Sequence, residues 1–295
     1  MDGRFTREIL DEVLAETGAL LGFSAVGATL LRFTNNAVYA LAADPLVVRI
    51  VGSRALRHRV GNVVRVAEHF ARHDVPAIRL LPDVEQPLRL GEHLVTVWQK
   101  VASTGSEPTA ADLAVLLLRV HSLPPPDGLP AWSPLDAVRA RVGDAEELAD
   151  RDRRFLLNRC DELEMALGQL TFALPRGLVH GDAHRGNVLV GPDGPVLCDF
   201  DSACIGPPEW DLTPLAVGRE RFGDPAGRYQ SLVDGYGFDV TSWSGFPVLR
   251  AVRELKLTTS VLPILRSHPN VREELRRRLN DLQDGRTGNR WHRYR

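Results

Sequence analysis

The chain has 295 residues, of which 44% are hydrophobic and 25% charged, and its formal net charge is -2. These values are typical of a soluble globular protein with one large domain or two modest ones. The nearly neutral charge argues against an overall basic surface, so neither nucleic acid nor a membrane is expected as a partner. A charged N-terminal segment and the lack of a long apolar run predict a cytoplasmic protein. No sequence feature specifies the oligomeric state.

The first hundred residues predict a helix, a small sheet and a second helix. Apolar residues recur at helical spacing over 6–21 and again over 53–73. Three β-rich runs are separated by turns too short for crossover helices, which predicts an antiparallel meander: 25–33, 36–42 and 46–51. Further strands are expected at 77–81 and 93–102.

The remainder predicts a mainly helical region that contains one β-hairpin. The polar segment 103–109 is the expected linker, which gives an N-terminal lobe of residues 1–102 and a C-terminal lobe of residues 103–295. A Gly-Pro-Asp-Gly turn between apolar runs predicts a hairpin within 178–201. We expect the basic C-terminal tail to be mobile. The expected helices are 110–122, 134–142, 152–170, 208–218, 225–236, 245–266 and 270–283.

A polar segment, LVHGDAHRGNVLV at 178–190, interrupts the apolar runs of this hairpin region. His180, Asp182 and His184 form an HxDxH pattern, which on a strand could hold a metal such as zinc. A metal-dependent hydrolase is therefore one alternative. The glycines within the segment suit a turning loop better than an extended strand, and this argues against that alternative.

A second interpretation uses the hairpin itself. Because a hairpin brings its first and last residues side by side, Asn187 and Asp199 should lie close together. Their amide and carboxylate oxygens suit Mg²⁺, which keeps several waters and bridges phosphates. Asp182, on the preceding loop, would then accept the proton of a hydroxyl. Together these residues predict phosphoryl transfer, which requires charge neutralisation and an acceptor held in line.

The motif HGDAHRGN, followed by CDFD, resembles the aminoglycoside phosphotransferase and choline kinase-like family. The resemblance covers most of the chain and is diagnostic over 178–211. It implies a two-lobed, protein-kinase-like α+β fold with a small β-rich lobe and a larger, mainly helical lobe. It also implies that ATP and Mg²⁺ are the cofactors, and that the γ-phosphate passes to a hydroxyl of a small-molecule acceptor.

The resemblance also implies individual roles. Asp182 is the catalytic base, and Asn187 and Asp199 are the Mg²⁺ ligands. His184 either contacts the transferred phosphate or faces solvent, and His180 supports the loop through backbone hydrogen bonds.

Two acidic residues follow the diagnostic motif. Asp211, in GPPEWDL, resembles an aspartate that braces the catalytic loop from the next helix. Asp201 could be a second metal ligand, although capping of the next turn is favoured.

The N-terminal lobe departs from the family pattern. Arg49 stands where the family has a lysine, and its guanidinium could hold the nucleotide phosphates. Its acidic partner is unassigned, because no glutamate stands at the expected helical position. There is no Gly-rich loop, and the turn that ends at Asn36 is the nearest candidate to cover the phosphates. In VTVWQKV, Trp98 would shape an adenine pocket or belong to the core, while Gln99 and Val101 would offer main-chain hydrogen bonds.

These departures keep open a catalytically silent relative that binds nucleotide and has a regulatory role. The acceptor is not specified by any motif. Several acidic residues could line a pocket for a cationic acceptor such as an aminoglycoside or amino alcohol, although solvated positions are favoured. These residues are Glu209, Asp234, Asp239 and Glu254.

Overall fold

The computed structural model describes residues 6–33, 36–52 and 57–294. The chain forms two compact units. The first contains Met1–Pro108, Pro124–Leu129 and Arg185–Ala203; the second contains Thr109–Leu123, Pro130–His184 and Cys204–Arg295. The sequence placed a single boundary between residues 102 and 103. The units differ from it because two later segments pack with the first unit.

The first unit is built on a five-stranded antiparallel sheet with the order β1-β2-β3-β5-β4. The meander predicted for the first three strands is confirmed. Residues 77–81, predicted as a strand, form only isolated bridges, because their backbone bonds to Leu197 at one end and to β5 at the other. The strands are β1 (Thr29–Phe33), β2 (Asn36–Ala40), β3 (Leu46–Val51), β4 (Leu88–Leu90) and β5 (His93–Gln99).

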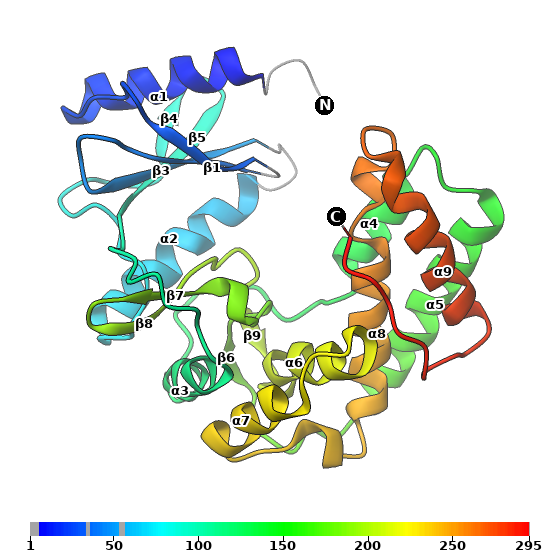
Figure 1. The fold of residues 1–295 in the computed structure, drawn as a ribbon. Coiled ribbons are helices and arrows are strands. Elements are labelled where there is room, and N and C mark those ends of the chain that lie inside the picture. The colour runs from blue at the N-terminus through cyan, green and yellow to red at the C-terminus, as the bar shows by residue number, and fades with distance from the viewer. Residues whose placement is uncertain (1–5, 34–35, 53–56, 295) are drawn as a thin grey trace. The chain divides into compact units, whose positions relative to one another are not determined.

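Helices α1 (Arg7–Leu21) and α2 (Arg57–Arg72) lie on opposite sides of this sheet (Figure 1). Apolar residues of α1 share a core with Val48 and Ile50 of β3, whereas Val51 packs with α2. Because successive residues of a strand point to opposite faces, Arg49 lies on the face of Val51, away from α1. The guanidinium of Arg49 can therefore reach partners only on the side of the sheet that α2 covers.

The predicted hairpin consists of β7 (Val188–Gly191) and β8 (Gly194–Leu197), preceded by the short 3₁₀ turn η2 (Arg185–Asn187). Both of its edges bond to the first unit. The Ile78 N–H donates to the Leu197 carbonyl at 2.9 Å, and the Thr104 N–H donates to the Val190 carbonyl at 3.1 Å. These bonds explain why the hairpin belongs to the first unit although it directly follows Pro130–His184, a segment of the second unit.

The second unit is mainly helical, as predicted, and includes a small ladder between β6 (Gly177–Val179) and β9 (Cys204–Gly206). Its core contains buried apolar residues of α4, α5, α6, α8 and α9. In the part of the chain that the structure describes, no helix has the length and apolar character needed to cross a membrane. The helices are α3 (Ala110–His121), α4 (Asp136–Asp144), α5 (Asp150–Gly168), α6 (Glu209–Phe222), α7 (Ala226–Tyr236), α8 (Phe246–Thr259) and α9 (Arg272–Gln283), with short 3₁₀ turns η3 (Val240–Ser242), η4 (Leu262–Ile264) and η5 (Pro269–Val271).

The C-terminal segment after α9 is anchored, so the prediction of a mobile tail is wrong. Trp291 is buried, its backbone N–H donates to the Arg221 carbonyl at 2.6 Å, and its indole N–H donates to Asp281 at 2.8 Å. The guanidinium of Arg278 lies 3.8 Å from the ring centre of Tyr294. Aromatic residues placed between arginines hold this segment against α6, α8 and α9, and Arg293 of the segment pairs with Asp224 at 2.9 Å.

Candidate functional site

The HGD loop follows β6 in the second unit, and Asp211 holds it from the first turn of α6. The Asp211 carboxylate is fully buried and accepts the N–H of His180 at 2.6 Å and of Gly181 at 2.8 Å. Gly181 has a φ of 81°, a backbone conformation that strongly favours glycine. The predicted brace is therefore confirmed, and the carboxylate satisfies two consecutive backbone donors that would otherwise be buried without partners.

The neighbours of Asp211 extend this brace. The Trp210 indole N–H donates to the Gly181 carbonyl at 2.8 Å, and His121 Nε2 lies 3.1 Å from Asp211 Oδ2. Glu209, offered as a possible contact for a cationic acceptor, is instead buried and accepts the backbone N–H groups of residues 173 and 174. All three side chains of the EWD motif thus make hydrogen bonds that hold backbone groups of preceding segments in place. The sequence predicted this role only for Asp211.

Asp182 follows directly in this loop, and basic groups surround its carboxylate. Arg253 of α8 donates from Nη1 to Asp182 Oδ1 at 2.7 Å, and His184 Nε2 lies 3.8 Å from Oδ2. Burial acts to raise the pKa of Asp182, but the charges of Arg253, His184 and Lys256 outweigh burial and hold that pKa well below its usual range. The carboxylate is therefore ionised, as a general base must be.

His180 supports the loop as predicted. It is buried, and its Nδ1 accepts the Asp182 N–H at 3.3 Å. This role conflicts with the HxDxH alternative, in which His180 and His184 would bind one metal ion. Within the described residues, no cluster of three or more His, Cys, Asp or Glu side chains has the arrangement of a metal site.

A second basic residue of α8, Lys256, was not singled out from the sequence as a site residue. Its Nζ lies 5.0 Å from the ring centre of Trp210, the residue whose indole holds the loop. Burial and the charge of Arg253 lower the pKa of Lys256 to about 8, although Asp182 opposes them. The sequence feature that could have pointed to Lys256 is the rarity of lysine, because the chain has only two lysines.

In the first unit, Arg49 is paired with Asp201. Arg49 Nη2 donates to both carboxylate oxygens of Asp201 at 2.6 Å, and both side chains are largely buried. Burial acts to raise the pKa of Asp201, and the charge of Arg49 lowers it below the ordinary value. Asp201 is thus the acidic partner of Arg49 that the sequence left unassigned. The sequence favoured a turn cap for Asp201, and the structure shows this ion pair instead.

The hairpin places Asn187 beside the residue that precedes Asp199. The Cys198 N–H donates to the Asn187 carbonyl at 2.9 Å, adjacent to the pairing of Val188 with Leu197. Asp199 has a φ of 68°, a left-handed conformation that is uncommon for a non-glycine residue and clusters at functional sites. Asn187 and Asp199, the latter with a partly exposed carboxylate, thus lie at the ends of the two arms of one hairpin, and their role as Mg²⁺ ligands stays a prediction.

The other residues predicted for nucleotide binding have mixed placements. Trp98 is 4% exposed, donates to the Thr96 hydroxyl at 2.8 Å and packs edge-to-face on Phe200, as a core residue does. The Gln99 N–H donates to the Arg79 carbonyl at 2.8 Å, so this N–H is engaged within the fold, and a contact of the Gln99 main chain with adenine stays a prediction. Among the described residues, the Val101 backbone has no hydrogen-bond partner.

The turn proposed to cover the phosphates lies mostly outside the described residues. Residues 34 and 35 are not described, and Asn36 begins β2 opposite Val51. Arg32 lies on β1, the strand before this turn, and its Nη1 is 3.4 Å from Asp199 Oδ2. This arginine was not predicted from the sequence, and its charge balances one of the proposed metal ligands.

The acidic residues offered for a cationic acceptor are engaged elsewhere. Glu254 is buried and bonds to Arg221 and Arg250. Asp239 caps η3, and Asp234 accepts a hydrogen bond from a neighbouring glutamine. With Glu209 also buried in backbone contacts, the structure gives no support to an acidic acceptor pocket built from these four residues.

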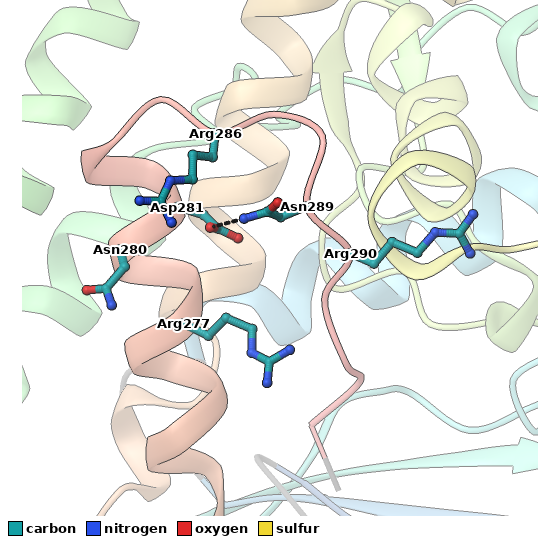
Figure 2. A pocket seen from close by; sticks show the side chains of 6 residues that line it. All are labelled: Arg277, Asn280, Asp281, Arg286, Asn289 and Arg290. Carbon is teal, nitrogen blue, oxygen red and sulfur yellow. Dashed lines mark hydrogen bonds between the residues drawn. The ribbon is translucent and has the colours of Figure 1, made fainter.

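A polar hollow of about 350 Å³ lies between α9 and the C-terminal segment (Figure 2). Asp281 there accepts a hydrogen bond from Asn289 at 2.7 Å, and Arg286 pairs with Asp284 at 2.8 Å. None of the predicted site residues lines it. This hollow is therefore part of the anchoring of the C-terminal segment rather than the candidate site. Its lining residues are Arg277, Asn280, Asp281, Arg286, Asn289 and Arg290.

Known proteins are similar to this chain in sequence. The model of the phosphotransferase enzyme family matches residues 31–254. A hydroxyurea phosphotransferase of Kitasatospora aureofaciens is 33% identical over 129 residues, which cover 43% of this chain and 37% of that protein. The match thus spans little more than a third of that relative.

Solved structures share the fold over nearly the whole chain. An amicoumacin kinase in complex with AMP-PNP, Ca²⁺ and Ami has a TM-score of 0.73 at 16% identity, covering 97% of this chain and 96% of its own. A choline/ethanolamine kinase family protein of Mesorhizobium loti has a TM-score of 0.66 at 16% identity, with coverages of 93% and 94%. A spectinomycin phosphotransferase in complex with ADP and spectinomycin has a TM-score of 0.61 at 16% identity, with coverages of 92% and 93%. The predicted α+β fold of small-molecule kinases is confirmed.

Proposed function

This chain belongs to the phosphotransferase enzyme family, and on that premise we propose that it transfers the γ-phosphate of ATP, with Mg²⁺, to a hydroxyl of a small molecule. The observation that carries the proposal is the braced loop of the second unit. Asp211 fixes the two residues before Asp182 through their backbone, and Asp182 is held ionised. A positioned carboxylate of this kind can orient an acceptor hydroxyl and take its proton.

The nucleotide contacts are assigned to the first unit. Arg49 would hold nucleotide phosphates in place of the family lysine, and Asp201 fixes its guanidinium. The main-chain groups of Val101, which have no hydrogen-bond partner among the described residues, would bond to the adenine of ATP. The nucleotides bound in the amicoumacin kinase and spectinomycin phosphotransferase structures support this part of the proposal.

Asn187 and Asp199 are the residues that would hold Mg²⁺. When bound, the ion would neutralise charge on the phosphates during transfer. The left-handed backbone of Asp199 and its position one residue after the paired Cys198 fit a ligand whose direction is fixed by the hairpin. His184, 3.8 Å from the Asp182 carboxylate, is proposed as a contact of the transferred phosphate.

The catalytically silent alternative drew its support from the irregular N-terminal lobe. The pairing of Arg49 with Asp201 supplies the acidic partner that the sequence left unassigned, so this support is weakened. The intact Asp182 loop favours turnover over nucleotide binding alone.

The test is a panel of hydroxyl compounds with ATP and Mg²⁺, with phosphorylated product detected by mass spectrometry. Hydroxyurea belongs in the panel because of the Kitasatospora aureofaciens relative. Asp182→Asn should lower kcat by about 10²–10⁴-fold while leaving the Kd for ATP nearly unchanged. Asp161→Asn, on the exposed surface of the second unit, is the matched control. Nucleotide binding without product from a broad panel would support the silent relative instead.

A further inference from the structure

Two basic side chains of α8 converge on the proposed catalytic base. Arg253 and Lys256 are three residues apart, which places them on the same face of the helix. Arg253 contacts Asp182 directly, and Lys256 lies over the Trp210 ring that holds the same loop. We infer that these two charges select an acceptor that carries a negative charge close to its reacting hydroxyl. This inference rests on the proposed function and narrows its substrate class.

The positive charge here exceeds what the protein itself neutralises. Asp182 provides one negative charge and Arg253 already pairs with it. Within the described chain, Lys256 Nζ has no carboxylate at ion-pair distance, and Arg253 Nε is buried without a hydrogen-bond partner. A buried donor of a charged group normally has a partner, so an unpartnered one indicates a ligand that completes the site.

Proximity to the reacting hydroxyl links this charge to the acceptor. A hydroxyl that gives its proton to Asp182 lies about 3 Å from that carboxylate. Arg253 is 2.7 Å from Asp182 Oδ1, so its guanidinium lies within about 6 Å of a hydroxyl bound to that same oxygen. Across this distance, one unit charge on the acceptor changes its affinity by about 3- to 100-fold, depending on solvent exposure.

Neighbouring groups reinforce this preference. The titratable groups that face Lys256 are Arg253 of α8, Arg141 of α4, Asp182 in the loop and Cys204 of β9, whose thiol is kept protonated by burial. The acidic residues next to them in α8 and α6 are engaged: Glu254 bonds to arginines, and Glu209 and Asp211 accept backbone N–H groups. A polycationic acceptor would therefore meet like charge beside the base.

A different use of the same charges is stabilisation of the transferred phosphoryl group. The two uses are separable. Charges that select the acceptor change the KM for an anionic acceptor and leave neutral acceptors unaffected. Charges that serve the phosphoryl group change kcat equally for every acceptor, whatever its charge.

The first experiment uses three matched polyols with ATP and Mg²⁺: glycerate, glycerol and (2,3-dihydroxypropyl)trimethylammonium. We expect kcat/KM to decrease in this order, with glycerate preferred to glycerol by about 3- to 100-fold. Arg253→Gln and Lys256→Met should each reduce the preference for glycerate mainly through KM. Arg266→Gln, an equal loss of charge at a side chain that is 84% exposed, should leave it unchanged. Preference for the cationic diol, or an equal fall in kcat for all three, would overturn the inference.

The second experiment needs no turnover. Because Lys100 and Lys256 are the only lysines, limiting reductive methylation followed by peptide mass spectrometry reports each of them separately. Glycerate should slow the labelling of Lys256 and leave exposed Lys100 unaffected, while the cationic diol should protect neither. Protection of Lys256 by ATP alone, and by no anionic diol, would assign the charges to the phosphoryl group. If no diol is phosphorylated, the proposed function fails for this panel and the labelling still decides the inference.

A pH profile supplies a third readout. As pH rises above about 8, Lys256 loses its proton and the attraction for glycerate weakens, so the KM for glycerate should rise between pH 7 and pH 9.5. Lys256→Arg keeps its charge over this range and should keep the KM low. An unchanged rise in the Lys256→Arg variant would remove Lys256 from the inference.

Discussion

Replacing Asp211 with asparagine tests the brace that positions the proposed base. Asp211 is fully buried and accepts backbone N–H groups from His180 and Gly181 on separate oxygens. Asparagine has one acceptor oxygen, so it can keep only one of these bonds. Its amide nitrogen would face the other N–H, which would leave a buried donor without an acceptor.

The cost follows from these contacts. A hydrogen bond to a charged group contributes about 1.5–3 kcal/mol, and a buried unsatisfied donor costs about 1–3 kcal/mol, with overlap between the two. We therefore expect Asp211→Asn to lower the free energy of unfolding by about 3 kcal/mol. An unfolding entropy of about 2.1 cal/mol/K per residue over 295 residues converts this to a Tm decrease of about 5 °C.

Two measurements read the effect globally and locally. Calorimetry gives the Tm, and hydrogen exchange resolved on a peptide spanning 178–184 gives the protection of the two amides. Their exchange should accelerate by about 100-fold, because 1.36 kcal/mol corresponds to a factor of ten. Asp161→Asn, whose side chain is 71% exposed, should change neither measurement noticeably. A Tm within 1 °C of the parent together with unchanged exchange would refute the brace.

Three other predictions follow from the same structure. Arg49→Met should raise the Kd for ATP by about 10- to 100-fold in calorimetric titration, and an unchanged Kd would contradict the phosphate contact. Trp291→Ala should lower the free energy of unfolding by about 3–5 kcal/mol in urea titration, because the indole is buried; His292→Ala, with an exposed side chain, should have little effect, and equal effects would contradict the anchored tail. Burial raises the pKa of Cys160 to about 11 and that of Cys204 to about 12, above their ordinary 9.0. The unfolded chain therefore loses these thiol protons first, so the free energy of unfolding should fall as pH rises above about 9, and alanine at both positions should reduce that slope.

Local pattern was sufficient for most elements. Helical spacing of apolar residues predicted α1, α2 and the helices of the second unit, because burial of one face follows from a period of 3.6 residues. Short turns predicted the meander β1–β3 for an equally local reason. The HGD motif and the Asp211 brace were also readable, since the residue types and spacing that the chemistry requires lie within 34 residues of sequence.

Other features depended on segments far apart in the chain. Arg49 and Asp201 are 152 residues apart, and Asp182 and Arg253 are 71 apart. No periodicity joins such pairs, because each residue type alone also suits an exposed charge. The prediction of a mobile tail was wrong for the same reason, because a basic, polar composition is typical of mobile segments. In the structure the ring of Trp291 lies between the guanidinium groups of Arg221 and Arg278, which are distant in the sequence.

The sequence by itself thus determined the elements, the loop that carries Asp182 and the hairpin that carries Asn187 and Asp199. Tertiary structure alone decided which charges stand beside those groups. Coulomb interactions and burial act through space at a few ångströms, so the identity of a partner, and with it the charge of the acceptor that we propose, emerges only when α8 is packed against the loop.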